Sequence, residues 1–282
     1  MSSIVSSKPQ KVGSWNLFRN QLNYTFVSTY DSSTVTESKK AKVIILFVVG
    51  TGMSAGAYTD IAGKSVTGQS TVFVTVDNNP GALVKLSGDQ TAMAFNDLAA
   101  KATERLGDIV ASDAKIFIGG HSAGGFSAIA AMKVNGGKLD FEPAGFIGAD
   151  PLGKRPQVSS LTINCPTFSM GFTVETCAVT LKEAGLAAYN VTSDGNRILM
   201  QIVNPKDRGN QITHCIFASD GCPACPAHEA GAWVRQVVGD FAILFVDGVV
   251  KGKTVAKSKY VSATGDKSDL VNVFYGEETA TV

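Results

Sequence analysis

Short apolar segments without polar alternation recur along the chain. Each is rich in β-branched or aromatic residues and has the length of one strand; they lie at 42–49 (KVIILFVV), 71–77, 115–120, 144–150, 166–172 and 198–204. Continuous apolar segments of this length are typical of strands that are covered on both faces, as in parallel sheets. We therefore predict strands at these six positions and a first strand near 24–30.

Segments with a helical period lie between several of these strands. One stripe at helical spacing consists of Phe95, Leu98, Ala99, Ala102 and Leu106. Segments 124–134 and 229–246 have the same character. Alternating strands and helices predict the α/β class, with a mostly parallel central sheet and helices on both faces.

We expect one domain over the 282 residues. Its core spans about 42–248, preceded by an N-terminal strand region at 1–41 and followed by a polar tail at 251–282 that we expect to pack loosely. Residues 1–30 contain no Asp or Glu, a bias that resembles an organellar transit peptide. Trp15, Leu17 and Phe18 instead favour packing residues ahead of the first strand, which is our preferred interpretation.

Charge and hydropathy exclude several classes of partner. The net charge is +1 and the basic residues form no stripe, so we expect no nucleic-acid partner. No apolar segment has the length of a membrane span, and no apolar signal segment follows Met1. We expect a soluble protein, cytoplasmic or plastid and organellar rather than secreted.

The segment 116–129 (IFIGGHSAGGFSAI) carries the strongest chemical signal. A strand-like run leads into Gly120-His121-Ser122-Ala123-Gly124, and a small-residue helix follows directly. This G-x-S-x-G pattern between strand and helix is typical of a nucleophile elbow, where glycines make room for a strained serine. We predict that Ser122 is a nucleophile.

A serine nucleophile needs a base and an orienting acid. His214 lies in a loop between the last apolar strand and the last helix, whereas His228 lies at the start of that helix. Asp150 ends a predicted strand, whereas Asp194 and Asp207 lie in polar, turn-like surroundings. We predict His214 as the base and Asp150 as the acid, in the chain order Ser, acid, His.

The glycine-rich loop after the 42–49 strand is the candidate for the second half of an oxyanion hole. The backbone N–H groups of Thr51 and Ala123 are the predicted oxyanion donors. Met53, Tyr58 and His121 are predicted to contact the substrate.

Together these motifs resemble the α/β-hydrolase family and, within it, the chlorophyllase and polyester-hydrolase (cutinase-like) branch. The resemblance covers 42–248 and rests on LFVVGTGMSAGAYTDIAG, VFVTVD, GGHSAGGFSA, FIGADPLG and ITHCIFASDG in this order. Chlorophyllases have a similar glycine loop with a tyrosine at the position of Tyr58. This chain has Ala123 where that branch usually has Arg, and Thr213 where it has Gly.

The five cysteines fall in the second half of the chain: Cys165, Cys177, Cys215, Cys222 and Cys225. The single C-x-x-C pair disfavours both zinc and thioredoxin-like chemistry. We expect a disulfide among the last three, or from one of them to Cys165 or Cys177, that braces the loop carrying His214.

These features predict a serine hydrolase that cleaves a carboxylic ester through an acyl-enzyme, with no metal or organic cofactor. The expected partner is a small-molecule or lipid-like ester, and the resemblance adds chlorophyll to the candidate substrates. Acyl transfer or lipase-type activity on the same triad, and a non-catalytic binding protein of the same fold, are the alternatives.

Overall fold

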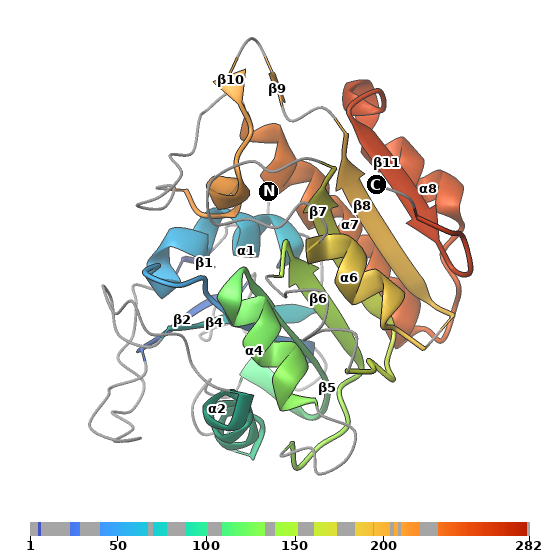
Figure 1. Ribbon diagram of the computed structural model, residues 1–282. Helices are drawn as coiled ribbons and strands as arrows, with labels where there is room; N and C mark the ends of the chain where they lie inside the picture. Colours follow the sequence, from blue (N-terminus) through green and yellow to red (C-terminus); the bar gives the residue numbers. More distant parts are fainter. Residues whose placement is uncertain are drawn as a thin grey trace.

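A nine-stranded, mostly parallel sheet forms the centre of the computed structural model (Figure 1). The structure describes residues 5–6, 23–28, 40–66, 70–77, 88–100, 109–132, 139–151, 161–173, 184–193, 195–203, 206–207, 210–219 and 231–280. The strands of the sheet are β1 (Val5–Ser6), β2 (Asn23–Ser28), β3 (Ala41–Val48), β4 (Thr71–Asp77), β5 (Val110–His121), β6 (Gly145–Ala149), β7 (Thr167–Phe172), β8 (Arg197–Ile202) and β11 (Val271–Tyr275). The strands β9 (Lys206–Asp207) and β10 (Asn210–Gln211) pair separately.

The strand order is β1-β2-β4-β3-β5-β6-β7-β8-β11. All neighbours from β4 to β8 pair in parallel, whereas β2 and β11 pair antiparallel at the two sides. The carboxyl ends of the six parallel strands therefore meet at one edge, which is where open α/β sheets bind ligands.

Helices cover both faces of the sheet (Figure 1). They are α1 (Thr59–Val66), α2 (Gly88–Ala100), α4 (Ala123–Ala131), α6 (Ala184–Asn190), α7 (Trp233–Val250) and α8 (Lys257–Ala263). Short 3₁₀ helices are η2 (Ala55–Tyr58), η4 (His214–Phe217) and η6 (Gly265–Lys267). Across the described parts of the chain, no helix combines the length and the apolar character that a bilayer span requires.

The side chains of β3 show how the two faces are built. Val43, Ile45 and Phe47 join a core with α1 and α7, while the intervening Ile44 and Leu46 join a second core with α2 and α4. Successive side chains of a strand point to opposite faces, so a strand buried on both faces is apolar throughout.

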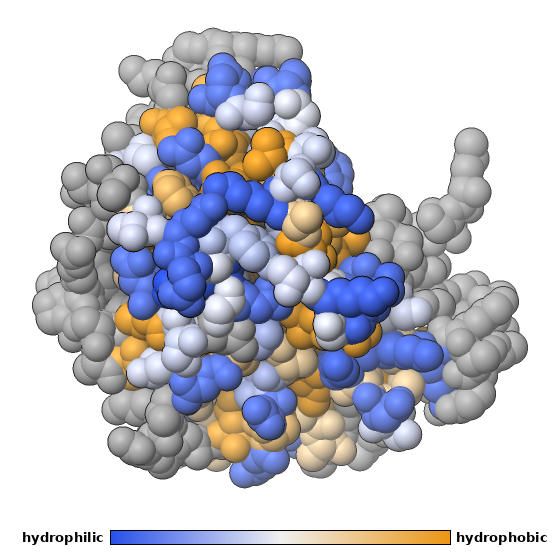
Figure 2. All heavy atoms as spheres, turned by 90° about the vertical axis from the view of Figure 1, so that its right-hand side faces the viewer, coloured by the Kyte–Doolittle hydropathy of each residue, from blue (hydrophilic) through white to orange (hydrophobic). Residues whose placement is uncertain are grey.

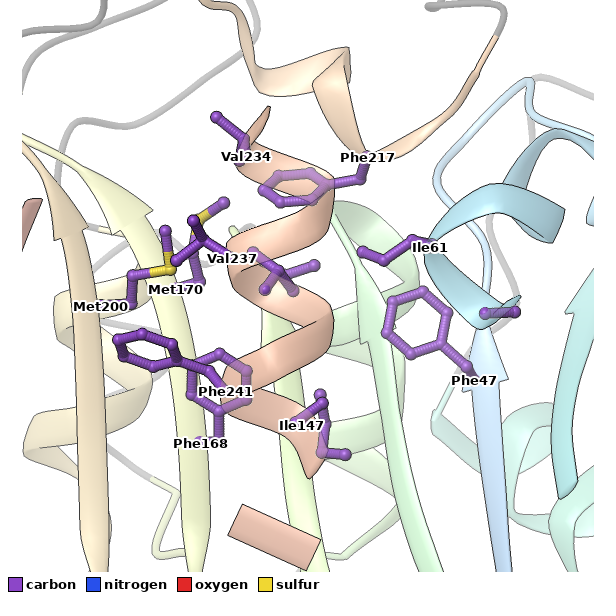
Figure 3. Packing of buried hydrophobic residues seen from close by; sticks show 14 of the residues in the cluster. Phe47, Ile61, Ile147, Phe168, Met170, Met200, Phe217, Val234, Val237 and Phe241 are labelled. Carbon is purple, nitrogen blue, oxygen red and sulfur yellow. The ribbon is translucent and has the colours of Figure 1, made fainter. Parts of the chain in front are cut away.

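Aromatic and aliphatic side chains of α7 fill the first core. In Figure 3, Val237 and Phe241 of α7 lie between side chains from several strands. The rings of Phe241 and Phe168 are 5.7 Å apart. This packing ties α7 to the strands β6, β7 and β8, whose ends carry the candidate site.

Most strand predictions are confirmed within a few residues. The exact match is β4, whereas β5 begins at Val110, five residues earlier than predicted. For the predicted helices, α2 ends at Ala100 in the described part, so Ala102 and Leu106 lie outside the described residues, as do Trp15, Leu17 and Phe18. The helices α1 and α6 were not predicted, because both are short.

The prediction of a loosely packed tail after residue 251 is wrong. Helix α8 buries Tyr260 against Phe241, with ring centroids 5.1 Å apart, and β11 adds to the sheet beside β8. Val271 and Val273 point inward from β11, while the polar residues that dominate this segment lie on the outside (Figure 2). A few well-spaced apolar residues thus suffice to anchor a segment of polar average composition.

Candidate active site

Ser122 lies on the turn between β5 and α4 with φ 55° and ψ −131°. The flanking glycines are required by space. A Cβ at Gly120 would lie 2.6 Å from the carbonyl carbon of Gly124, and a Cβ at Gly124 would lie 2.3 Å from the carbonyl oxygen of Val49. This is the steric reason for the G-x-S-x-G pattern, and the strain of Ser122 is the kind of outlier that marks functional sites.

Asp150 follows β6 directly and has φ 43°. Its N–H donates to the Met170 carbonyl at 2.8 Å, and the N–H of Ser122 donates to the Ala149 carbonyl at 3.1 Å. Because β5 and β6 are adjacent and parallel, these bonds bring Ser122 and Asp150 to neighbouring strand ends.

His214 is the first residue of η4, and its side chain contacts Asp150. Its Nδ1 lies 2.5 Å from Oδ2 of Asp150, and both side chains are buried, at 2% and 1% exposed. An ionised carboxylate only accepts hydrogen bonds, so Nδ1 carries the proton and donates it. In the neutral ring, Nε2 is then the nitrogen that can take a proton from a nucleophile.

Further contacts hold the loop around η4 in place. The N–H and Oγ of Ser219 both donate to the Ala57 carbonyl, at 2.8 and 2.9 Å. Arg235 of α7 donates from Nη1 to the Ile216 carbonyl at 3.0 Å and from Nε to Asp60 at 2.5 Å.

The ion pairs of Asp60 affect its ionisation. Burial opposes ionisation of Asp60, but the hydrogen bonds from Lys64 and Arg235 outweigh it and lower its pKa. Sequence reasoning missed these contacts, because no spacing pattern connects residues so far apart.

Tyr58 and His121 are placed behind the site rather than on its surface, at 0% and 1% exposed. Tyr58 Oη lies 2.6 Å from His121 Nδ1 and accepts the Gly50 N–H at 3.0 Å. His121 Nε2 lies 3.0 Å from the His214 carbonyl oxygen. Burial and the neighbouring His214 hold the pKa of His121 well below its usual value, and burial raises the pKa of Tyr58.

The predicted oxyanion donors follow the adjacent strands β3 and β5 at the same sheet edge. Ala123 is the first residue of α4, where helix geometry leaves N–H groups without an intrahelical acceptor. Thr51 is exposed, in a turn closed by the Met53 N–H on the Gly50 carbonyl at 3.1 Å, with Gly52 at φ 75°. Met53 itself is buried in the first core.

Cys215, the residue after His214, is disulfide-bonded. Cys165 keeps a buried thiol. The structure thus contains a disulfide in η4, at the residue directly after His214. Three cysteines, Cys177, Cys222 and Cys225, lie outside the described residues, as do Asp194 and the alternative base His228.

The chain matches no known protein-family model and no curated protein sequence. Function must therefore be inferred from the chemistry of the site.

Proposed function

We propose that this protein is a serine hydrolase that cleaves a carboxylic ester through an acyl-enzyme. One observation carries the proposal: the buried hydrogen bond between Asp150 and His214 lies at the sheet edge where the strained Ser122 directly precedes α4. A buried acid that orients a histidine beside a serine elbow is the arrangement that activates serine for acyl transfer.

In this mechanism Ser122 Oγ attacks the ester carbonyl carbon, while Nε2 of His214 takes the hydroxyl proton. Asp150 holds the imidazole in the tautomer that accepts this proton and stabilises the resulting positive charge. The N–H groups of Ala123 and Thr51 bind the negative oxygen of the tetrahedral intermediate. The alcohol leaves with the proton from His214, and water then repeats the sequence on the acyl-enzyme to release the acid.

The chain order Ser122, Asp150, His214 is that of α/β-hydrolases and supports assignment to that fold. The motif resemblance supports the chlorophyllase and polyester-hydrolase branch, and with it a lipid-like or pigment ester as substrate. The substitution of Ala123 for the usual Arg changes a side chain beside the nucleophile, so we include simple esters together with chlorophyll among the test substrates.

The test is labelling with a fluorophosphonate probe, combined with hydrolysis of short and long p-nitrophenyl esters and of chlorophyll. We expect wild type to be labelled and active, and Ser122→Ala to lose both properties. Ser65→Ala is the matched control, because Ser65 is a buried serine on α1 whose hydroxyl donates to the Ile61 carbonyl of the same helix at 2.8 Å. It should keep labelling and activity.

Two outcomes would replace the proposal. A wild-type protein that neither reacts with the probe nor turns over any ester would indicate a binding protein built on the same fold. Transfer of the acyl group to an added alcohol in preference to water would indicate an acyltransferase.

A further inference from the structure

We propose that Tyr58 and His121 are positioning residues, which form a buried hydrogen-bond relay that fixes the backbone of the catalytic base His214. The inference rests on the proposed function, since it assigns a purpose to two residues beneath the same site. It gives Tyr58 and His121 a role different from the substrate contact that the sequence suggested.

The His214 carbonyl determines which atom donates in the two hydrogen bonds of His121. A carbonyl oxygen only accepts, so the His121 nitrogen beside the His214 carbonyl, Nε2, carries the proton. The other nitrogen of the neutral ring, Nδ1, must then accept, and the Tyr58 hydroxyl donates to it at 2.6 Å. Tyr58 Oη in turn accepts the N–H of Gly50.

The relay joins the loop of the proposed oxyanion donor to the base. Gly50 precedes Thr51, and the series of hydrogen bonds that starts at Gly50 and passes through Tyr58 and His121 ends on the main-chain carbonyl of His214. The space is tight, because a Cβ at Gly50 would lie 2.9 Å from His121 Nδ1 and 3.3 Å from Ser122 Cβ. A shift of Tyr58 or His121 must therefore be transmitted to the reacting groups.

His214 is held from two directions. Asp150 binds the imidazole at Nδ1, and His121 binds the backbone carbonyl of the same residue. The His121 and His214 rings lie 4.4 Å apart. The low pKa of His121 keeps this neighbouring ring neutral, so it does not repel the positive charge that forms on His214 during turnover.

The test compares two substitutions of His121 with similar shape. In His121→Gln the amide N–H can reach the position of Nε2 and donate to the His214 carbonyl, whereas His121→Met fills similar space without a donor. We expect His121→Met to lower kcat about ten- to a hundredfold with little change in KM, because misplacing a catalytic group by about 1 Å costs about a hundredfold. His121→Gln should keep most of the wild-type kcat.

Tyr58→Phe provides a second variant, which removes only the hydroxyl and should lower kcat by about tenfold. Tyr189→Phe is its matched control. Tyr189 is equally buried, and its hydroxyl donates to the carbonyls of Gly276 and Glu278, at 2.9 and 3.0 Å, far along the chain from the site. This control should lose thermal stability without losing kcat.

Nitrogen NMR of the histidine rings supplies a readout that needs no activity. It should report His121 protonated at Nε2 in wild type, with a changed Nδ1 signal in Tyr58→Phe. The relay is wrong if His121 carries its proton on Nδ1, or if His121→Met and Tyr58→Phe both keep kcat within twofold of wild type. A wild type without esterase activity would instead overturn the proposed function, and the ring tautomer would still decide whether the relay exists.

Discussion

Ser122 and Asp150 are the two non-glycine residues with positive φ in the described part of the chain, and they follow directly on the adjacent strands β5 and β6. The N–H of Ser122 bonds the carbonyl of Ala149, the residue before Asp150. Positive φ costs an L-residue about 1–3 kcal/mol. Strain of this kind clusters at functional sites, and it therefore supports the roles proposed for both residues.

The glycines around Ser122 should be intolerant of any side chain. Gly124→Ala would place a Cβ 2.3 Å from the Val49 carbonyl oxygen and should lower the free energy of unfolding by about 3 kcal/mol. At Gly63, in helix α1, a Cβ meets nothing within 4 Å. Gly63→Ala should therefore raise stability by about 0.5–1 kcal/mol in the same urea titration. Equal effects of the two substitutions would contradict the tight contact between α4 and β3.

Asp150→Asn should preserve the fold and remove most of the activity. The amide has nearly the same shape as the carboxylate but stabilises the wrong tautomer of His214, a change that costs about 10⁴-fold in a well-studied serine protease. We expect a loss of kcat of this order, measured by ester hydrolysis, with a thermal midpoint close to wild type. Asp240→Asn, on the exposed side of α7 where Asp240 contacts Gln236, is the control. A variant of Asp150 that keeps a tenth of the activity would remove Asp150 from the triad.

His214 and His228 should respond differently to alanine. His214→Ala should abolish turnover almost as completely as Ser122→Ala, and the double variant should be scarcely worse, because members of a triad act as a unit. His228→Ala should change kcat by less than about tenfold, or roughly 1.4 kcal/mol. The reverse order in steady-state kinetics would reassign the base to His228.

His121 should make stability depend on pH in the acid range. Its pKa is well below 6.5 in the folded protein, while the unfolded chain protonates this residue near 6.5. The unfolded state then binds the extra proton, so the free energy of unfolding should fall as pH decreases below about 6.5, by up to about 1.4 kcal/mol per pH unit. The titratable groups that face His121 are Tyr58 and His214, beside the ring of Phe217.

The comparison with His121→Gln isolates this contribution, because glutamine does not titrate. Denaturant titrations between pH 5 and about 7.5 should show a shallower pH dependence in the variant. Identical slopes for the two proteins would mean that His121 is protonated equally in the folded and unfolded states.

The disulfide at Cys215 should stabilise the loop of His214. Reduction, or Cys215→Ser, should lower the free energy of unfolding by about 2–4 kcal/mol. A non-reduced digest should contain Cys215 in a cross-linked peptide and Cys165 as a thiol that can be alkylated after denaturation. A digest in which Cys215 is alkylated without reductant would contradict the bond.

The sequence by itself determined the local elements. The parallel strands could be predicted because a strand buried on both faces is apolar at nearly every position. Helix α7 could be predicted because its apolar residues recur with the helical period. The G-x-S-x-G pattern likewise predicted the strand–turn–helix around Ser122, since its glycines are required within one turn. The tail after residue 251 shows the limit, because its few buried apolar residues, among them Tyr260, Val271 and Val273, lie in a segment whose average composition is polar.

Only the tertiary structure decided which distant residues meet. The bond from Asp150 to His214 joins positions 64 residues apart, and the bond from Tyr58 to His121 joins positions 63 apart. Chain order made the first pair a reasonable prediction, but nothing in the sequence distinguishes Tyr58 as a partner of His121 rather than a pocket residue. The reason is physical: periodicity is a property of a single segment, whereas a hydrogen bond between segments depends on strand order, register and the path of the loops that cross the sheet edge.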